Sequence, residues 1–180
     1  MAVQPPFNLE KWLEENREHL KPPVGNKNLY KDAGDYIVII VAGPNARKDY
    51  HYNETEELFY QLEGEIMVHI QDEGEKRTME LGSGDMYLHP AKVPHSPVRK
   101  EGSIGLVVER KRAHLDGKDG LMWFCDNCNH KLYDVYFPLH DIEKDFLKHF
   151  KEFYSSKDLR TCDKCATVMP VDERFVADEE

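Results

Sequence analysis

The sequence predicts an all-β domain, a small closed barrel, with one helix before it and one after it. Short stretches rich in β-branched and aromatic residues follow one another from residue 36 to residue 109, and Gly, Asp, Glu and Pro separate them. The first stretch, YIVIIVA at 36–42, is an apolar run typical of a buried strand. Many short strands at near-regular spacing indicate a sandwich or barrel rather than alternating strands and helices.

Each element has its own local signal. After the first stretch, strands are expected at 57–62, 65–71, 76–81, 84–88 and 104–109. Residues 8–20 predict a short helix capped by Asn8, with an apolar face that packs on the outside of the barrel. From residue 141 to residue 154, apolar side chains recur at helical spacing and predict an amphipathic helix of three to four turns.

Length and composition limit the domain organisation. The 180 residues suit one domain of ordinary size, and 40% hydrophobic residues can bury a core. We expect residues 1–115 to form the barrel with its N-terminal helix. We expect residues 116–180 to form an appendage packed on the same domain, and the boundary falls within a turn-rich linker, AHLDGKDG at 113–120.

Charge and hydropathy exclude several partners. The net charge of −10 argues against nucleic acid and against an anionic membrane surface, both of which select basic faces. No apolar run is long enough for a transmembrane helix, and the N-terminus lacks a signal-peptide pattern. We therefore expect a cytoplasmic protein.

Three dispersed residues predict a metal site. His51, Glu57 and His95 lie among strand-forming residues, and two His with one carboxylate are typical of non-heme Fe(II) oxygenases, because this set leaves one face of the ion open. Six residues of straight strand would separate His51 from Glu57 by roughly 20 Å. The chain must therefore turn between them, and a barrel is the simplest way to bring the three segments together.

Two arginines accompany these candidate ligands. On a strand, residues two apart share a face, so Arg47 would point with His51, and Arg99 with His95. Arginine in a metal-bearing cavity indicates an acidic small-molecule substrate, because its guanidinium grips a carboxylate with two hydrogen bonds. Either arginine could instead pair with Asp49 or Glu109. Glu109 itself could take a proton from the substrate or simply pair with a basic neighbour, Arg110 or Lys111.

The four cysteines predict a second metal site. They form two CxxC pairs, and four thiolates in paired knuckles suit zinc or a rubredoxin-like iron. Redox disulfides or free thiols are the alternative. We expect the site to fasten the C-terminal region to the barrel without taking part in the chemistry; its ligands would be Cys125, Cys128, Cys162 and Cys165.

Two motifs resemble those of the cupin superfamily. Glu57 and Gly64 match the first motif, and Gly84, Pro90 and His95 match the second. The resemblance implies a jelly-roll barrel, also described as a double-stranded β-helix. Asn53 stands where the first motif commonly has a second His, and Lys92 stands where a Gly is usual.

Longer segments resemble one family within the cupins, the 3-hydroxyanthranilate 3,4-dioxygenases. The similarity covers residues 7–170, with Lys48 where Thr is expected and His89 where an aliphatic residue is expected. His89 could compete as a metal ligand, although we expect it to point outward or to lie behind the ligands. The segments that carry the resemblance are PPVGN at 22–26, GPNARKDYH at 43–51, EELFYQ at 56–61, PHSPVR at 94–99 and VVERKR at 107–112.

The family resemblance implies an activity and a set of roles. It implies Fe(II)-dependent ring opening of 3-hydroxyanthranilate by O2 to 2-amino-3-carboxymuconate semialdehyde, the quinolinate precursor of kynurenine breakdown and NAD biosynthesis. It also implies a homodimer and, as in short microbial members, a rubredoxin-like cysteine site. The implied site residues are His51, Glu57 and His95 for iron; Arg99, Asn26 and Arg47 for the substrate carboxylate; Arg47 for O2; Glu109 for the proton; and Glu57, Phe59 and Pro97 around the ring.

Two other function classes stay open at this point. A different cupin enzyme, an isomerase or decarboxylase, would use the same barrel and would work without O2. A non-catalytic metal-binding cupin would use the CxxC pairs to recruit a partner. A zinc-ribbon nucleic-acid binder is opposed by the acidic charge.

Overall fold

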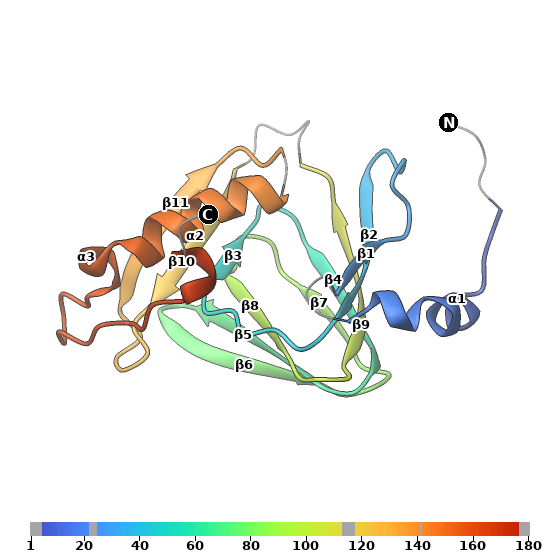
Figure 1. Cartoon of the computed structure of the whole chain (residues 1–180), viewed down its shortest axis with the longest axis horizontal. Coiled ribbons are helices and arrows are strands. Elements are labelled where there is room, and N and C mark those ends of the chain that lie inside the picture. Colours follow the sequence, from blue (N-terminus) through green and yellow to red (C-terminus); the bar gives the residue numbers. More distant parts are fainter. Residues whose placement is uncertain (1–4, 22–24, 113–117, 141, 177–180) are drawn as a thin grey trace.

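Two antiparallel sheets face each other and close into a barrel, with helix α1 at one side and helix α2 at the other (Figure 1). The computed structural model describes residues 5–21, 25–112, 118–140 and 142–176. This architecture confirms the predicted all-β jelly-roll fold. Among the described helices, none is long and apolar enough to cross a membrane.

The first sheet has five strands in the order β1-β2-β9-β4-β7. Its edge strand β1 and the outer face of β2 lie beside α1 in Figure 1. The strands are β1 (Asn26–Asn28), β2 (Tyr36–Ala42), β9 (Ile104–Arg110), β4 (Glu57–Glu63) and β7 (Met86–His89).

The second sheet has six strands in the order β11-β10-β3-β8-β5-β6, and it extends from the barrel into the C-terminal region. The strands are β11 (Lys131–Phe137), β10 (Asp119–Phe124), β3 (Tyr50–Tyr52), β8 (His95–Arg99), β5 (Ile66–Asp72) and β6 (Glu75–Leu81).

The chain crosses repeatedly from one sheet to the other. β3, β5 and β8 belong to the second sheet, whereas β4, β7 and β9 belong to the first. Side chains alternate between the two faces of a strand, so every second residue points into the space between the sheets. On β4 these inward residues are Glu57, Phe59 and Gln61, all buried. Glu57 at the start of β4 faces the site, whereas Phe59 further along also belongs to the apolar core.

An apolar cluster fills the interior beyond the site. It contains Phe59 and Val107 from the first sheet, and Ile66, Val68, Ile70 and Leu81 from the second. A separate cluster packs α1 (Leu9–Asn16) against the outer face of the first sheet through Leu13 and Ile40. Asn8 caps α1, because its Oδ1 accepts from the Lys11 amide at 2.9 Å, as predicted.

A third cluster joins the C-terminal helix to the second sheet. α2 (Ile142–Ser155) lays Phe153 against Trp123 of β10, with ring centroids 4.3 Å apart and planes 15° from parallel. Two short helices follow, α3 (Lys157–Arg160) and the 3-10 turn η2 (Glu173–Phe175); another 3-10 turn, η1 (Arg17–His19), ends the N-terminal helix. Both aromatic rings of the stack are fully buried, so this cluster anchors the C-terminal region to the barrel.

The expected strands all form, with ends that shift by one or two residues. The prediction was wrong for the end of the linker: Asp119 and Gly120 begin β10, whereas 113–117 lie outside the described residues. β10 starts before its buried residues Leu121 and Trp123, because the chain already pairs with β3 and β11 there. The short strand β1 and the short helix α3 were not predicted, because three or four mostly polar residues carry no periodic signal.

Removing the ring of Phe153 should destabilise the fold. Phe153→Ala leaves a cavity beside Trp123, so we expect the free energy of unfolding to fall by about 3–5 kcal/mol in urea titrations. Leu147→Ala is the matched control on the same helix, since that side chain is 39% exposed. The control should change stability by less than about 0.5 kcal/mol. Equal losses in the two variants would show that the stack does not anchor α2.

Candidate active site and cysteine metal centre

His51, Glu57 and His95 meet at one end of the barrel interior. His51 of β3 and His95 of β8 are direct cross-strand neighbours in the second sheet. Glu57 is the first residue of β4 and reaches them from the first sheet. Its Oε2 lies 3.0 Å from His95 Nε2, and all three side chains are buried. The turn predicted between His51 and Glu57 is therefore a crossing between the two sheets.

The geometry of these three side chains fits a metal ion. One donor atom from each residue lies within 4.8 Å of the others. Neighbouring ligands at roughly 2.1 Å from one ion would be about 3 Å apart, as Glu57 and His95 are. In the described part of the chain, no other His, Cys, Asp or Glu joins this group. Two His and one carboxylate leave coordination positions for other molecules.

The electrostatics of the ligands also suit a cation. Burial alone would raise the pKa of Glu57, but the neighbouring His95 and His51 rings outweigh it and lower the pKa to about 2. Burial lowers the pKa of His51, which favours the neutral imidazole that binds metals. An ionised carboxylate at Glu57 and a neutral ring at His51 are protonation states that suit metal ligands.

Two neighbouring residues support the ligands without joining them. Asn53 Nδ2 donates to Glu57 Oε2 at 3.3 Å, so the residue at the place of the second cupin His orients the carboxylate. His89 is fully buried and does not point outward. Its Nδ1 contacts Tyr87 Oη at 3.0 Å and its Nε2 contacts the Val93 carbonyl at 2.8 Å. Because both ring nitrogens have partners, His89 lies behind the ligands rather than among them.

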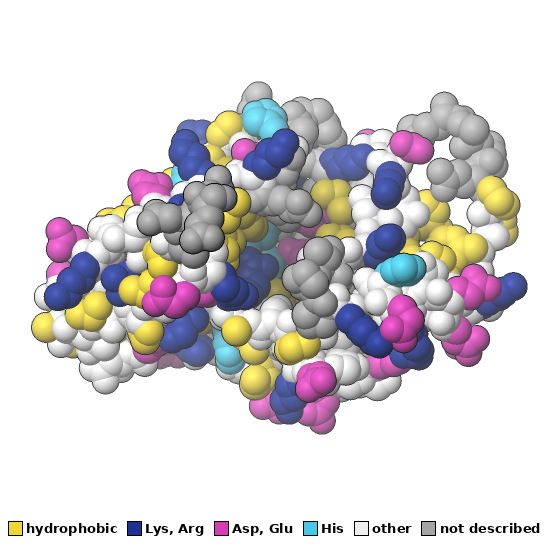
Figure 2. Space-filling model, in the orientation of Figure 1, with side chains coloured by type: hydrophobic (Ala, Val, Ile, Leu, Met, Phe, Trp, Pro, Cys, Tyr) yellow, Lys and Arg dark blue, Asp and Glu magenta, His cyan; other side chains and the backbone are white. Residues whose placement is uncertain are grey.

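A cavity of about 440 Å³ opens onto the candidate ligands. Figure 2 shows the molecule hollowed near its middle, with basic and His side chains visible inside. Every site residue predicted for iron, substrate or O2 lines this cavity: Asn26, Arg47, His51, Glu57, Phe59, His95, Pro97, Arg99 and Glu109. The structure therefore brings the whole predicted set to one place.

The two arginines of the cavity differ in their partners. Arg47 pairs with Asp49 through two contacts, one of them 3.3 Å from Nε to Oδ1, so the structural pairing considered for Arg47 exists. Arg99 does not pair with Glu109: its side chain is buried, and among the described residues its Nη1 has no hydrogen-bond partner. Burial lowers the pKa of Arg99 to about 10, so it stays charged at neutral pH. An unpaired buried cation is costly, and an anion would satisfy it.

A glycine makes room for this arginine. Gly105 lies on β9 beside Arg99, and a Cβ added to it would come within 2.9 Å of Arg99 Nη1. A glycine in the interior of a strand often marks a close approach of this kind.

Glu109 faces the cavity from the first sheet. It is the register partner of Glu57 on the neighbouring strand. Burial and the nearby Glu57 raise the pKa of Glu109 to about 7, against the opposing effect of Arg112. Its basic partner is Arg112, at 2.7 Å, rather than the predicted Arg110 or Lys111. A carboxylate with a pKa near neutrality can accept and release protons.

Several residues of the site were not predicted. Asp119 lies 2.6 Å from His51 Nε2, and the Phe146 ring packs at 5.2 Å from the His51 ring. Phe146 and Arg174 line the cavity from the C-terminal region. Asp119 carried no usable signal because it lies in a turn-like DGKDG context, whereas the helical spacing of Phe146 indicated only a buried residue.

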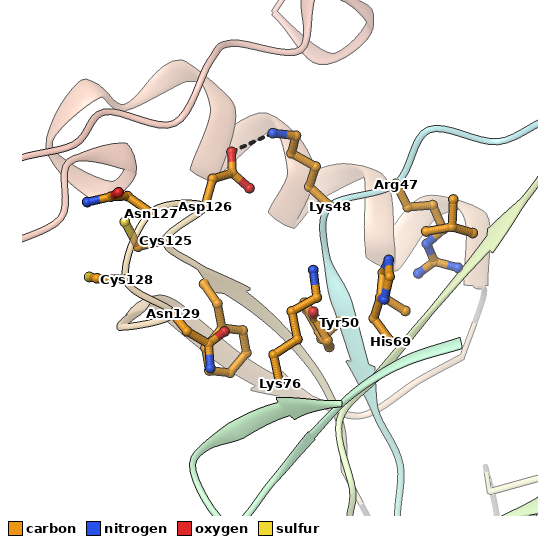
Figure 3. Close-up of a pocket in the computed structure, with 13 residues that line it drawn as sticks. Arg47, Lys48, Tyr50, His69, Lys76, Cys125, Asp126, Asn127, Cys128 and Asn129 are labelled. Carbon is orange, nitrogen blue, oxygen red and sulfur yellow. Dashed lines mark hydrogen bonds and ion pairs between the residues drawn. The ribbon is translucent and has the colours of Figure 1, made fainter. Parts of the chain in front are cut away.

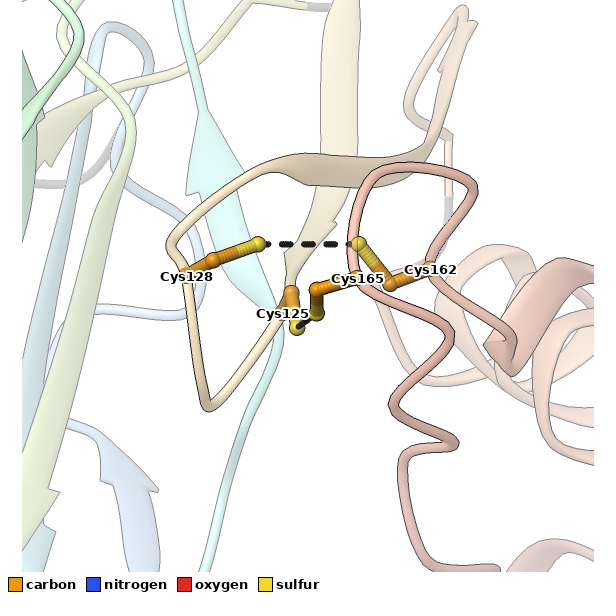
Figure 4. Close-up of side chains that lie close together, drawn as sticks. All are labelled: Cys125, Cys128, Cys162 and Cys165. Carbon is orange, nitrogen blue, oxygen red and sulfur yellow. Dashed lines mark hydrogen bonds between the residues drawn. The ribbon is translucent and has the colours of Figure 1, made fainter.

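The four cysteines come together where two loops of the C-terminal region face each other (Figure 4). The Sγ atoms of Cys125 and Cys165 lie 3.6 Å apart, as do those of Cys128 and Cys162. Disulfide sulfurs would be about 2.05 Å apart, whereas tetrahedral thiolates at roughly 2.3 Å from one ion would be about 3.8 Å apart. The cluster fits a metal with four sulfur ligands, and all four cysteines are free.

The knuckle that carries Cys125 and Cys128 is tied to the barrel across a second cavity of about 450 Å³. Figure 3 shows Lys48 and Asp126 facing each other across it, with Nζ and Oδ2 2.5 Å apart. On another side, the Asn129 amide exchanges two hydrogen bonds with Gln71 of β5, at 2.8 and 2.9 Å. These contacts hold the cysteine site against the outer face of the second sheet.

Removal of one thiolate should lower the stability of the fold more than it lowers the turnover rate. In Cys125→Ser we expect the midpoint of thermal unfolding to fall and one metal ion per chain to be lost from the cysteine site. Turnover per metal ion at the His–Glu–His cluster should change less than about twofold. Metal analysis, calorimetry and activity on the same sample measure all three quantities. A loss of turnover per iron with unchanged stability would give the thiolates a part in the chemistry.

Comparisons with known proteins identify the family of the chain. The family model of 3-hydroxyanthranilic acid dioxygenase matches residues 1–154. The chain is 52% identical over 176 residues to a 3-hydroxyanthranilate 3,4-dioxygenase of Xanthomonas euvesicatoria, covering 98% of both chains. It is 44% identical over 165 residues to one of Bacillus thuringiensis, covering 91% of both.

Among solved structures, a cupin-2 domain protein of Shewanella frigidimarina has a TM-score of 0.46 at 20% identity, over 55% of this chain and 92% of the other. The residues that the family model matches include His51, Glu57 and His95. The chain belongs to the 3-hydroxyanthranilic acid dioxygenase family.

Proposed function

We propose that the chain opens the ring of 3-hydroxyanthranilate with O2, using Fe(II) at His51, Glu57 and His95, to give 2-amino-3-carboxymuconate semialdehyde. One observation carries the proposal: a buried arginine with an unpaired Nη1, Arg99, lines the same cavity as the metal ligands. A substrate with a carboxylate beside an aminophenol satisfies both features at once. The names of the relatives support this choice of substrate.

The residues of the cavity have separate tasks in this reaction. Bound Fe(II) would supply electron transfer between the electron-rich ring and O2, which avoids the spin barrier to direct attack. Arg99, with Asn26 and Arg47, holds the substrate carboxylate and so fixes the orientation of the ring. Phe59 and Pro97 line the ring and exclude water from it.

Two charged residues that line the cavity, Glu109 and Arg47, take part in proton transfer and oxygen binding. Glu109 accepts the proton that the aminophenol loses on binding, because its carboxylate faces the cavity beside Glu57. Arg47, which Asp49 holds in place, provides the positive charge beside which O2 is reduced. Both oxygen atoms enter the product as the C3–C4 bond of the ring breaks. The product closes to quinolinate without the enzyme, which places the activity in kynurenine breakdown or NAD biosynthesis.

An oxygen-addition experiment tests the proposed reaction. The protein is loaded with Fe(II) without oxygen, mixed with 3-hydroxyanthranilate, and then exposed to O2 while absorbance and oxygen uptake are recorded. We expect one O2 consumed per substrate and a new absorbing product. Conversion of substrate before O2 is added would favour an isomerase or decarboxylase. Tight metal binding without any conversion would favour a non-catalytic cupin.

Arg99→Ala should separate binding of the carboxylate from binding of the aminophenol. We expect kcat/KM for 3-hydroxyanthranilate to fall roughly 10- to 150-fold, the loss of about 1.5–3 kcal/mol typical of a hydrogen bond to a charged group. Turnover of 2-aminophenol, which lacks the carboxylate, should change far less. Arg77→Ala on the exposed strand β6 is the control. Equal losses for the two substrates would show that Arg99 does not hold the carboxylate.

Three further proposals concern the metal at the cysteines, the cellular compartment and the oligomeric state. We propose iron or zinc at the four cysteines, bound as in rubredoxin-like sites. Free thiols arranged for a metal suit a reducing compartment, which supports a cytoplasmic location. A homodimer is supported by an apolar row on the outer face of the first sheet, where Val38, Val108, Leu58 and Leu88 are register neighbours.

A charge in this row should break the proposed dimer. Leu88 is 56% exposed, and Met86 beside it is 65% exposed. We expect Leu88→Lys to convert a dimer into a monomer in analytical ultracentrifugation, because a lysine cannot be buried there without a partner. Tyr136→Lys, at another exposed hydrophobic residue, should remain dimeric. A monomeric unmodified chain, or a dimeric Leu88→Lys, would contradict this interface.

A further inference from the structure

A buried series of ionic contacts connects the wall of the cavity to a metal ligand. The guanidinium of Arg112 donates from Nη1 to Glu109 Oε2 at 2.7 Å. Its Nε and Nη2 donate to the two oxygens of Asp119, at 2.9 and 2.8 Å. Asp119 Oδ2 in turn lies 2.6 Å from His51 Nε2. Each of these four side chains is less than a tenth exposed, so water does not replace the contacts.

The series joins groups that the backbone does not hold together. Glu109 belongs to the first sheet, whereas His51 and Asp119 belong to the second. Hydrogen bonds within a sheet fix the spacing of its own residues, but they do not fix the distance between facing sheets. Arg112 lies two residues after β9, and its guanidinium joins Glu109 of β9 to Asp119 of β10 at the end of the barrel where the site lies.

The chemistry of arginine suits this position. Its planar fork binds both oxygens of Asp119 and still has an Nη1 hydrogen for Glu109, whereas a lysine ammonium would act as a point charge. One buried guanidinium thus serves two carboxylates. A carboxylate that holds the ring of a metal-binding His is a known means of fixing the orientation of that ligand.

We propose that Arg112 and Asp119 are positioning residues, which fix the spacing between the proton-accepting carboxylate of Glu109 and the metal-binding ring of His51. The role of Glu109 rests on the proposed function, whereas the orientation of His51 requires only that this ring binds a metal. Arg112 would act on the reaction through Glu109, and Asp119 would act on metal affinity through His51.

Metal binding tests the second half of this proposal without any turnover. The protein, with zinc already at its cysteine site, is titrated with Co(II) in oxygen-free buffer, and the visible spectrum reports the geometry of the bound ion. Asp119→Asn and Arg112→Lys should each weaken Co(II) binding by about 10- to 100-fold and shift its spectrum. Arg160→Lys is the matched control, since Arg160 is also buried but bonds to backbone carbonyls away from the cavity.

Turnover tests the first half. Arg112→Lys should lower kcat by about 10- to 100-fold at saturating metal and change KM less than about threefold, because Arg99 still holds the carboxylate. If Arg112 acts through Glu109, the same substitution should lower kcat less than about threefold in a Glu109→Gln background.

The outcomes separate the two proposals. Unchanged Co(II) affinity and spectrum in both variants, or equal effects of Arg160→Lys, would overturn the positioning role at His51. Independent effects of Arg112→Lys and Glu109→Gln on kcat would overturn the role at Glu109. A chain that binds Co(II) as expected but never converts 3-hydroxyanthranilate would contradict the proposed function, while the titration would still support the contact series at the metal.

Discussion

The site depends on one constraint. The two sheets must pack face to face so that polar side chains from both meet at one end of the barrel interior. His51 and His95 need only neighbouring strands, and their cross-strand register holds them side by side. Glu57 comes from the opposite sheet, so its carboxylate reaches the two rings only when the barrel closes. The apolar cluster around Phe59 and Val68, further along the same strands, stabilises that closure. The relative positions of the three candidate ligands therefore depend on the packing of the apolar core.

The C-terminal region contributes to the same site. β10 pairs with β3, the strand of His51, and places Asp119 beside the ring. Phe146 of α2 packs against the His51 ring and lines the cavity. The Trp123–Phe153 stack and the four cysteines hold this region against the barrel. The cysteine cluster is thus linked to the candidate active site through the packing of the C-terminal region.

The sequence allowed most of the fold to be predicted, because β-branched runs and turn residues are local signals. YIVIIVA at 36–42 and the helix from 142 appear where their patterns place them. The candidate ligands could also be predicted, since His, Glu and the surrounding Gly and Pro follow a motif. The partners of these residues could not. Whether Glu109 pairs with Arg110, Lys111 or Arg112 depends on how the chain leaves β9, and only the folded barrel decides it. Asp119 is adjacent to His51 through strand pairing across 68 positions, for which no spacing rule exists.

A crystal structure of the protein loaded with Fe(II) and grown without oxygen would test the central claim most directly. Anomalous scattering at the iron edge would locate each ion and its ligands. The predicted result is one iron held by His51, Glu57 and His95, with its remaining positions open to the cavity that Arg99 and Glu109 line. No iron at these three residues, or a fourth protein donor such as Asp119 or His89 on the open side, would contradict the account.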